Sequence, residues 1–181
     1  MSRDMYLWQN ITWIFFHKLA LNQDFSKNIA YETFFNAFKT LIPCSMCRNH
    51  YILMLNEKEY NLKNNIMNKT LFNFTIDIHN HVNIRTNRKV WNYDIGLKHY
   101  KSFFLNFNDI KRFINIYIYH NYKKGPEKTN KLFEMLRAFT HIFPRYNVRE
   151  KLLKFQQSIK PNKKNFHNWI RAYLFIIKSE M

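Results

Sequence analysis

Cys44 and Cys47 are the only cysteines of this 181-residue chain, and only Ser45 and Met46 separate them. One helical turn brings side chains at i and i+3 to the same side of a helix, so the two thiols can close a small, easily reduced disulfide. A helix N-terminus would stabilise the thiolate that reduction releases. The spacing therefore indicates reversible redox chemistry rather than a structural cross-link.

A Cys-x-x-Cys pair has other uses, and the surrounding residues bear on each of them. A zinc site would need two further ligands, for which His50, His79 and His81 are candidates, but they form no second ligand pair with finger-like spacing. A thioredoxin motif should follow a β-strand, whereas this pair follows a segment with helical periodicity. Two unpaired thiols in a hydrophobic core are the remaining alternative.

Helices are expected to position these residues. Apolar residues recur at helical spacing, while two Gly and four Pro are too few for a many-stranded β fold, so we predict an all-α protein. In the first half we expect helices over about 5–21, from 26 or 30 to 41, from Pro43 (as a first-turn proline) through Met54, over 70–84 and from 92 to 100, with a loop or short helix over 56–68. Beyond residue 106 we expect helices over 108–121, 127–142, 145–158 and 163–179.

Three segments carry a resemblance to a known family. Trp13 and His17 form a W-x-x-x-H helix, Pro43 begins a P-C-x-x-C-x-x-H-Y segment, and His79 begins an H-N-x-V-N helix. In order and spacing they resemble the Erv/ALR family of FAD-linked sulfhydryl oxidases, over roughly residues 5–100. The resemblance implies an FAD-binding four-helix bundle with a short fifth helix, and it implies no metal.

The resemblance also implies a role for each matching residue. Cys47 would be the flavin-proximal thiol, and Cys44 the thiol that a substrate attacks. Basic residues would lie near the FAD phosphates, although the proline that commonly follows them in the family is absent here. The residues that would contact FAD are Trp13, His17, Cys47, His50, His79, Asn80, Asn83 and Arg88 or Lys89.

Helical spacing is compatible with such a site. Trp13 and His17 are i and i+4, as are His79 and Asn83, so each pair projects from one face of its helix. Taken alone, a Trp and a His at this spacing are most simply core residues. Two imidazoles and amides on an otherwise apolar stripe would be costly to bury unless a polar group satisfied them. Converging faces of this kind would form a slot for flat rings.

The implied activity is thiol oxidation. Dithiol protein substrates, or a thioredoxin-like shuttle protein, would reduce the Cys44–Cys47 disulfide, and oxygen would be the electron acceptor, giving hydrogen peroxide. Many family members carry a distant shuttle cysteine pair, which this chain lacks, so a substrate would have to reach Cys44 directly.

No secretory signal is recognisable and no stretch approaches the ~20 apolar residues that span a membrane, so we expect a cytoplasmic protein without membrane contact. The amino-acid composition, rich in Lys, Asn, Ile and Phe, is typical of proteins encoded by AT-rich genomes. It resembles that of the family members encoded by large DNA viruses. Disulfide formation in virion proteins, in the host cytoplasm or the virion, is the corresponding hypothesis.

The formal net charge of +17 raises a rival from another class, a basic, zinc-stabilised nucleic-acid-binding protein. The Lys and Arg residues are spread along the chain, and an AT-rich genome enriches Lys without selection for a polyanion. We therefore regard nucleic-acid binding as the weaker interpretation.

The chain divides into two expected domains, an oxidase-like domain over 1–104 and a helical domain over 105–181. The segment from Ala37 to Pro43 aligns with the segment from Ala138 to Pro144, and Arg145 and Val148 then stand at the cysteine positions. One hypothesis makes the second domain a degenerate copy that replaces the partner of a homodimer. The alternative makes it a docking module for substrates or acidic partners.

Overall fold

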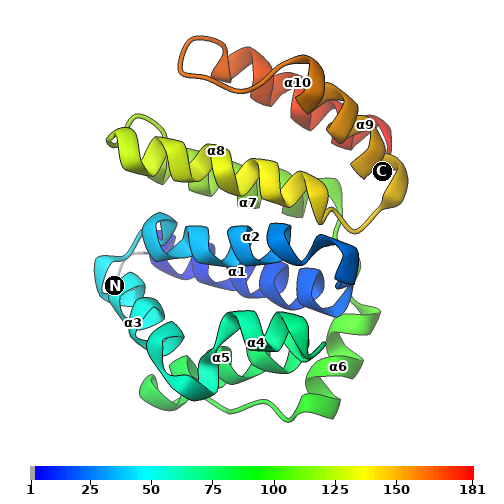
Figure 1. Ribbon diagram of the computed structural model, residues 1–181. Helices are drawn as coiled ribbons and strands as arrows, with labels where there is room; N and C mark the ends of the chain where they lie inside the picture. The colour runs from blue at the N-terminus through cyan, green and yellow to red at the C-terminus, as the bar shows by residue number, and fades with distance from the viewer. Residues whose placement is uncertain (1–2) are drawn as a thin grey trace.

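The computed structural model describes residues 3–181, with side chains from Trp8 onward, and this part of the chain contains helices and no strand (Figure 1). The all-α prediction is confirmed. The first half comprises α1 (Arg3–Leu21), a 3-10 turn (Phe25–Lys27), α2 (Asn28–Leu41), α3 (Ser45–Asn56), a second 3-10 turn (Lys58–Tyr60), α4 (Leu62–Met67), α5 (Leu71–Arg85) and α6 (Tyr93–Ser102). The second half comprises α7 (Phe107–Asn121), α8 (Pro126–His141), α9 (Tyr146–Ser158) and α10 (Phe166–Ser179).

Two predicted helix starts are wrong, and each has a local cause. Pro43 lies outside α3, because Cys44 takes the N-cap position with an extended backbone and its Sγ accepts the Cys47 N–H. The last helix begins at Phe166 rather than at 163. There the Asn162 side chain accepts the N–H groups of Lys164 and Asn165, a turn that competes with helix formation.

The predicted start of α7 coincides with a capping box. Asn106 Oδ1 accepts the Asp109 N–H at 3.0 Å, and the Asp109 carboxylate accepts the Asn106 N–H at 3.2 Å. Two of the N–H groups that a helix start leaves unpaired are satisfied in this way. Pro126 opens α8 directly after Gly125, whose φ of 114° favours glycine.

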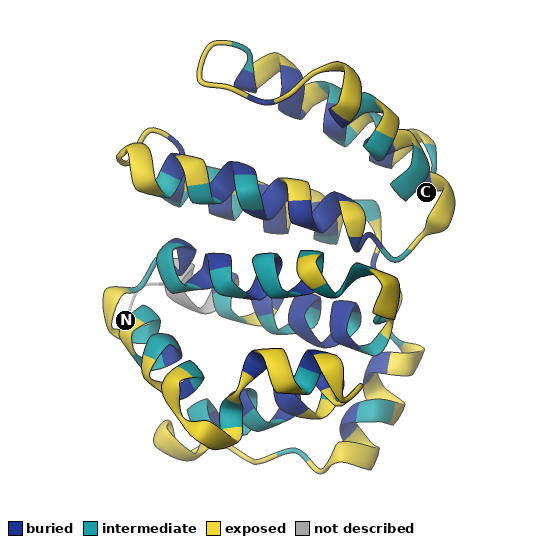
Figure 2. Ribbon diagram, in the orientation of Figure 1, coloured by how far each residue is buried: buried dark blue, intermediate teal, exposed yellow. Residues whose placement is uncertain are grey.

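The helices pack in layers around α1 and α2. Helices α3 to α6 cover one side of this pair, α7 and α8 cover the other side, and α9 and α10 lie outermost (Figure 1). Buried residues line the faces of α1, α2 and α8 that point towards neighbouring layers (Figure 2). Aromatic rings fill the junction between the two halves: Phe15 stacks on Phe113 with ring centroids 4.0 Å apart, and Phe38 meets Tyr117 edge-on at 5.1 Å. One hydrophobic core therefore runs through residues of both halves.

Helices α2 and α8 lie antiparallel across this junction. At one end Thr40 donates to the Glu127 carboxylate at 3.4 Å. At the other end Ser26 and His141 both line a groove of about 660 Å³. The sequence alignment that pairs Ala37 with Ala138 also pairs Thr40 with His141 and Ser26 with Glu127. The residues at one end of the helix pair are therefore aligned with the residues at the other end.

None of the described helices is both long enough and apolar enough to cross a membrane.

Candidate active site

A stack of flat rings joins α1 to α5. Trp13 and His79 lie parallel, with centroids 4.2 Å apart and planes within 6°. Trp91, on the segment between α5 and α6, continues the stack on His79 at 6.5 Å. All three side chains are half-buried, so part of each ring stays accessible. Such a surface can pack against another flat ring.

His17 lies fully buried behind this stack and bonds through both ring nitrogens. Its Nδ1 is 2.9 Å from Thr75 Oγ1, and its Nε2 is 2.9 Å from His79 Nδ1. Tyr100 of α6 packs on the His17 ring with centroids 4.3 Å apart. The predicted convergence of Trp13, His17 and His79 is therefore present in the fold.

Both imidazoles are held neutral. Burial lowers the pKa of His17 well below its ordinary value, and the neighbouring His79 and His99 lower it further. Burial also lowers the pKa of His79 to about 4, helped by the positive charge of Arg88. At neutral pH each ring therefore has one N–H donor and one nitrogen acceptor.

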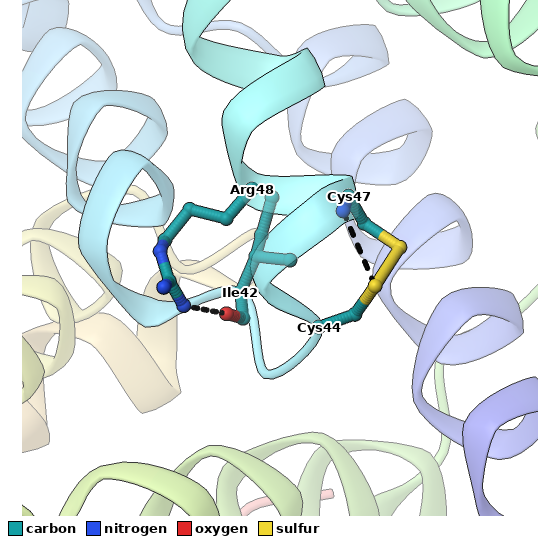
Figure 3. The surroundings of a disulfide bond; sticks show 4 residues. All are labelled: Ile42, Cys44, Cys47 and Arg48. Atoms are coloured by element: carbon teal, nitrogen blue, oxygen red, sulfur yellow. Dashed lines mark hydrogen bonds between the residues drawn. A yellow bond between two sulfur atoms is a disulfide. The ribbon is translucent and has the colours of Figure 1, made fainter.

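Cys44 and Cys47 form a disulfide at the start of α3, with Cα atoms 5.2 Å apart (Figure 3). Both residues are half-buried, and the Cys47 N–H points at Cys44 Sγ from 3.2 Å. The Arg48 side chain extends away from the sulfurs and donates to the Ile42 carbonyl at 2.9 Å, which holds the segment leading into the disulfide (Figure 3). The helix N-terminus and the Cys47 N–H together favour negative charge on a reduced sulfur.

The two predicted asparagines hold the turn that follows α5. Asn80 donates to the Trp91 carbonyl at 2.8 Å and accepts the Trp91 N–H at 2.7 Å. Buried Asn83 donates from its side chain to the Lys89 carbonyl at 3.1 Å, and its own carbonyl accepts the Arg88 N–H at 2.7 Å. The Asn80 amide thus fixes Trp91 beside His79, and the Asn83 amide holds the turn at Lys89, while direct contact with a ligand stays a prediction for both asparagines.

Basic side chains surround the outer end of α5. Burial lowers the pKa of His50, one turn beyond Cys47, and the nearby charges of Arg85 and His81 lower it further. Arg88 lies close enough to His79 to lower the pKa of that ring, and the Lys89 side chain is exposed. No hydrogen bond joins the disulfide to the ring stack among the described residues, although Cys44, Cys47 and Trp13 all pack against the same hydrophobic core.

Sequence reasoning missed three members of this cluster, Thr75, Trp91 and Tyr100. Thr75 is four residues before His79 and shares its helix face, so helical spacing could have identified it. Trp91 and Tyr100 reach the cluster through the path of the turn after α5 and the packing of α6, for which the local sequence carries no signal.

The residues present fit a flat nucleotide cofactor. The ring stack offers apolar surface, and because His79 uses Nδ1 for its contact with His17, its Nε2 is left to meet solvent or a polar ligand. Arg88 and Lys89 add positive charge beside the same turn, which suits phosphates.

Comparison with known proteins leads to the same group. The model of the Erv1 / Alr family matches residues 10–102. A protein of Acanthamoeba polyphaga mimivirus, provisionally named a FAD-linked sulfhydryl oxidase, is 36% identical over 92 residues, which cover 48% of this chain and 63% of the relative. A protein of Frog virus 3 (isolate Goorha) with the same provisional name is 33% identical over 63 residues, covering 35% of this chain and 41% of the relative. The matches thus span less than two thirds of either relative, and no solved structure matches this chain.

Proposed function

Because the chain belongs to the Erv1 / Alr family, we propose that it is an FAD-dependent thiol oxidase that forms disulfide bonds in protein substrates. The observation that carries the proposal is the Cys44–Cys47 disulfide at the N-terminus of α3, in the same bundle as the ring stack of Trp13 and His79. The names of the two viral relatives support FAD as the cofactor.

The chain's own part of the reaction is thiol–disulfide exchange. A substrate thiolate attacks Cys44 Sγ, the Cys44–Cys47 bond breaks, and Cys47 leaves as a thiolate in the first turn of α3, where the helix N-terminus stabilises it. The second substrate thiol then attacks the mixed disulfide and releases Cys44. The substrate loses two electrons and two protons, which the Cys44–Cys47 pair gains.

FAD, when bound, would accept these two electrons from the pair and pass them to oxygen, giving hydrogen peroxide. The flat surface of Trp13 and His79 would hold one of its ring systems. Arg88 and Lys89 would face its phosphates, and His50 would add to the positive surroundings of Cys47. These assignments follow the family resemblance and the fit of the residues described above.

The absorption spectrum of the purified protein tests the proposal. We expect a yellow protein with flavin absorbance that oxidises dithiothreitol, consumes oxygen and releases hydrogen peroxide. Cys47→Ser and Cys44→Ser should each lose turnover while keeping the flavin, whereas Ser45→Ala, between them, should keep both. Stoichiometric zinc without flavin would instead favour the nucleic-acid-binding rival.

Partners and location extend this proposal. A dithiol protein substrate should be oxidised directly at Cys44, and a requirement for a thioredoxin-like shuttle would appear as slow oxidation of reduced proteins beside rapid oxidation of dithiothreitol. Both named relatives are viral, which supports the hypothesis of a viral enzyme acting on virion proteins. Fractionation of infected cells with an antibody to the protein would test the host cytoplasm and the virion.

We also propose that residues 105–181 are a degenerate second copy of the oxidase fold. The alignment that pairs Ala37 with Ala138 also pairs Ser45, the first residue of α3, with Tyr146, the first residue of α9. A second alignment pairs Leu71 with Phe166, the first residues of α5 and α10. In it, four buried residues of α5 align with four buried residues of α10: Leu71, Phe74, Thr75 and Ile78 with Phe166, Trp169, Ile170 and Tyr173. In these alignments Arg145, Val148, Leu174 and Lys178 replace Cys44, Cys47, His79 and Asn83.

Such a copy would replace the second subunit of a homodimer, because α8 already covers α2. The expected result is a monomeric full-length protein by sedimentation. A chain ending at residue 104 would expose the apolar face of α2 and should self-associate. If the second half is instead a docking module, that shortened chain should stay monomeric and keep its full activity on dithiothreitol.

A further inference from the structure

The hydroxyl of Thr75 links the backbone of α5 to the buried His17. Thr75 Oγ1 donates to the Phe72 carbonyl at 2.7 Å and lies 2.9 Å from His17 Nδ1. A hydroxyl has one proton to donate. If that proton pointed at His17, two oxygen atoms would face each other at 2.7 Å with no proton between them. His17 must therefore donate from Nδ1 to Thr75.

This assignment passes on to His79. Since His17 is neutral and protonated at Nδ1, its Nε2 carries a lone pair. The 2.9 Å contact between His17 Nε2 and His79 Nδ1 needs one proton, which His79 must supply from Nδ1. His79 is also neutral, because burial holds its pKa at about 4. Its Nε2 therefore carries a lone pair too.

We propose that Thr75 is a positioning residue that fixes the tautomers of His17 and His79, so that His79 presents Nε2 to the cofactor as a hydrogen-bond acceptor. The donor on the other side is an N–H or O–H group of the bound nucleotide, and the parallel Trp13 ring holds the plane of the imidazole. A ligand with only a lone pair at this position is disfavoured. The second part of the proposal rests on FAD being the cofactor; the tautomers themselves do not.

Nitrogen-15 NMR of the histidine side chains tests the tautomers in full-length protein at neutral pH, before and after removal of any bound flavin. For both His17 and His79 we expect a protonated Nδ1 and an unprotonated Nε2 in both states. A protonated Nε2 on His79 in the wild-type protein would overturn the proposal, whatever the protein binds. Failure to bind flavin with the expected tautomers present would instead count against the proposed function.

A pair of substitutions separates the hydroxyl from the shape of Thr75. Thr75→Val keeps the branched side chain and removes the hydroxyl, so we expect His79 to shift towards the Nε2–H form and flavin to bind about tenfold more weakly, about 1.4 kcal/mol. Thr75→Ser keeps the hydroxyl and should therefore keep the wild-type tautomer of His79 and the wild-type affinity for flavin.

The control is Thr70→Val, at the exposed N-cap of the same helix, which should leave the tautomers and the flavin affinity unchanged. Circular dichroism at neutral pH establishes that each variant is folded. Unchanged histidine tautomers in folded Thr75→Val would contradict the proposed role, and if that variant does not fold, the wild-type NMR spectrum still decides.

Discussion

Asn121, the last residue of α7, donates from Nδ2 to the Leu41 carbonyl at 3.0 Å, and Leu41 precedes Cys44 by three residues. The second amide proton goes to the Tyr117 carbonyl, also at 3.0 Å. In the sequence alignment that pairs Ala37 with Ala138, the residue that corresponds to Asn121 in the first half is Ala20, which has no side-chain amide. The contact thus ties the second half to the segment before the disulfide and has no counterpart at the other end of the α2–α8 pair.

Asn121→Ala should destabilise the protein by about 1 kcal/mol, because it leaves the Leu41 carbonyl without its donor in a buried place. Removal of the buried Asn121 Oδ1, which has no hydrogen-bond partner, offsets part of that cost. The free energy of unfolding from urea titration measures the effect. Asn130→Ala, at an exposed position on α8, is the control and should change the stability by less than about 0.5 kcal/mol. Equal stabilities of the two variants would show that the contact contributes nothing.

Acid should weaken the fold through the histidine pair. In the unfolded chain His17 and His79 take up protons near pH 6.5, whereas in the folded protein the pKa of His79 is about 4 and that of His17 is also lowered. The unfolded state therefore binds more protons as the pH falls from about 6.5 to about 4, and stability falls over that window. Arg88 and His99, which face the pair, add to the cost of its protonation.

The loss attributable to His79 is on the order of 3 kcal/mol by pH 4. It is measured by urea unfolding at about pH 7 and about pH 4.5. His79→Gln should flatten the pH dependence, and His167→Gln, at an exposed histidine of α10, should leave it intact. A wild-type stability that does not fall with acid would contradict the lowered pKa values.

The presence and approximate extent of the long helices were predictable because apolar periodicity is a local property. Phe34, Phe38 and Leu41 mark the buried face of α2 in the sequence, and all three are fully buried. The start of α3 was less accessible, since Pro43 is compatible with the first turn of a helix or with the residue before its cap. Only the capping by Cys44 Sγ distinguishes the two.

The site was predictable in its residue types and less so in their contacts. Spacing placed Trp13 and His17 on one face of α1, whereas only the family resemblance brought His79 to them; in the fold the three rings do meet. That Asn80 and Asn83 clamp the turn after α5 could not be foreseen, because their partners are backbone groups whose position depends on the path of that turn. The antiparallel contact of α2 with α8 likewise depends on packing between distant segments, which no local pattern encodes.

Gly96 allows α6 to approach α5 closely. A Cβ at this buried position would lie 2.8 Å from Cδ1 of the buried Ile76, closer than atoms can pack. Gly96→Ala should therefore cost about 1 to 2 kcal/mol through overpacking, even though alanine favours a helix. Thermal unfolding gives the stability difference.

A double-mutant cycle identifies the cause. Ile76→Val removes Cδ1, and the next atom, Ile76 Cγ1, lies at an ordinary 3.6 Å from the added Cβ. In that background Gly96→Ala should be neutral or stabilising by up to roughly 1 kcal/mol, the helix preference of alanine over glycine. The same penalty in both backgrounds would rule out Ile76 as the residue that requires glycine.

The shared aromatic core predicts that the two halves unfold together. Phe139 of α8 contacts Phe15 of α1 and Phe34 of α2, with ring centroids 5.8 and 6.0 Å apart. Phe139→Ala should cost about 3 to 5 kcal/mol. Because the lost contacts cross the junction, hydrogen exchange in denaturant should report the same loss of protection for peptides from α5 and from α8. Phe175→Ala, at a position 70% exposed on α10, should leave the protection of the α5 and α8 peptides unchanged. Protection lost in α8 alone would mean that the second half is an independently folding module, and the proposed replacement of a second subunit would then lack its physical basis.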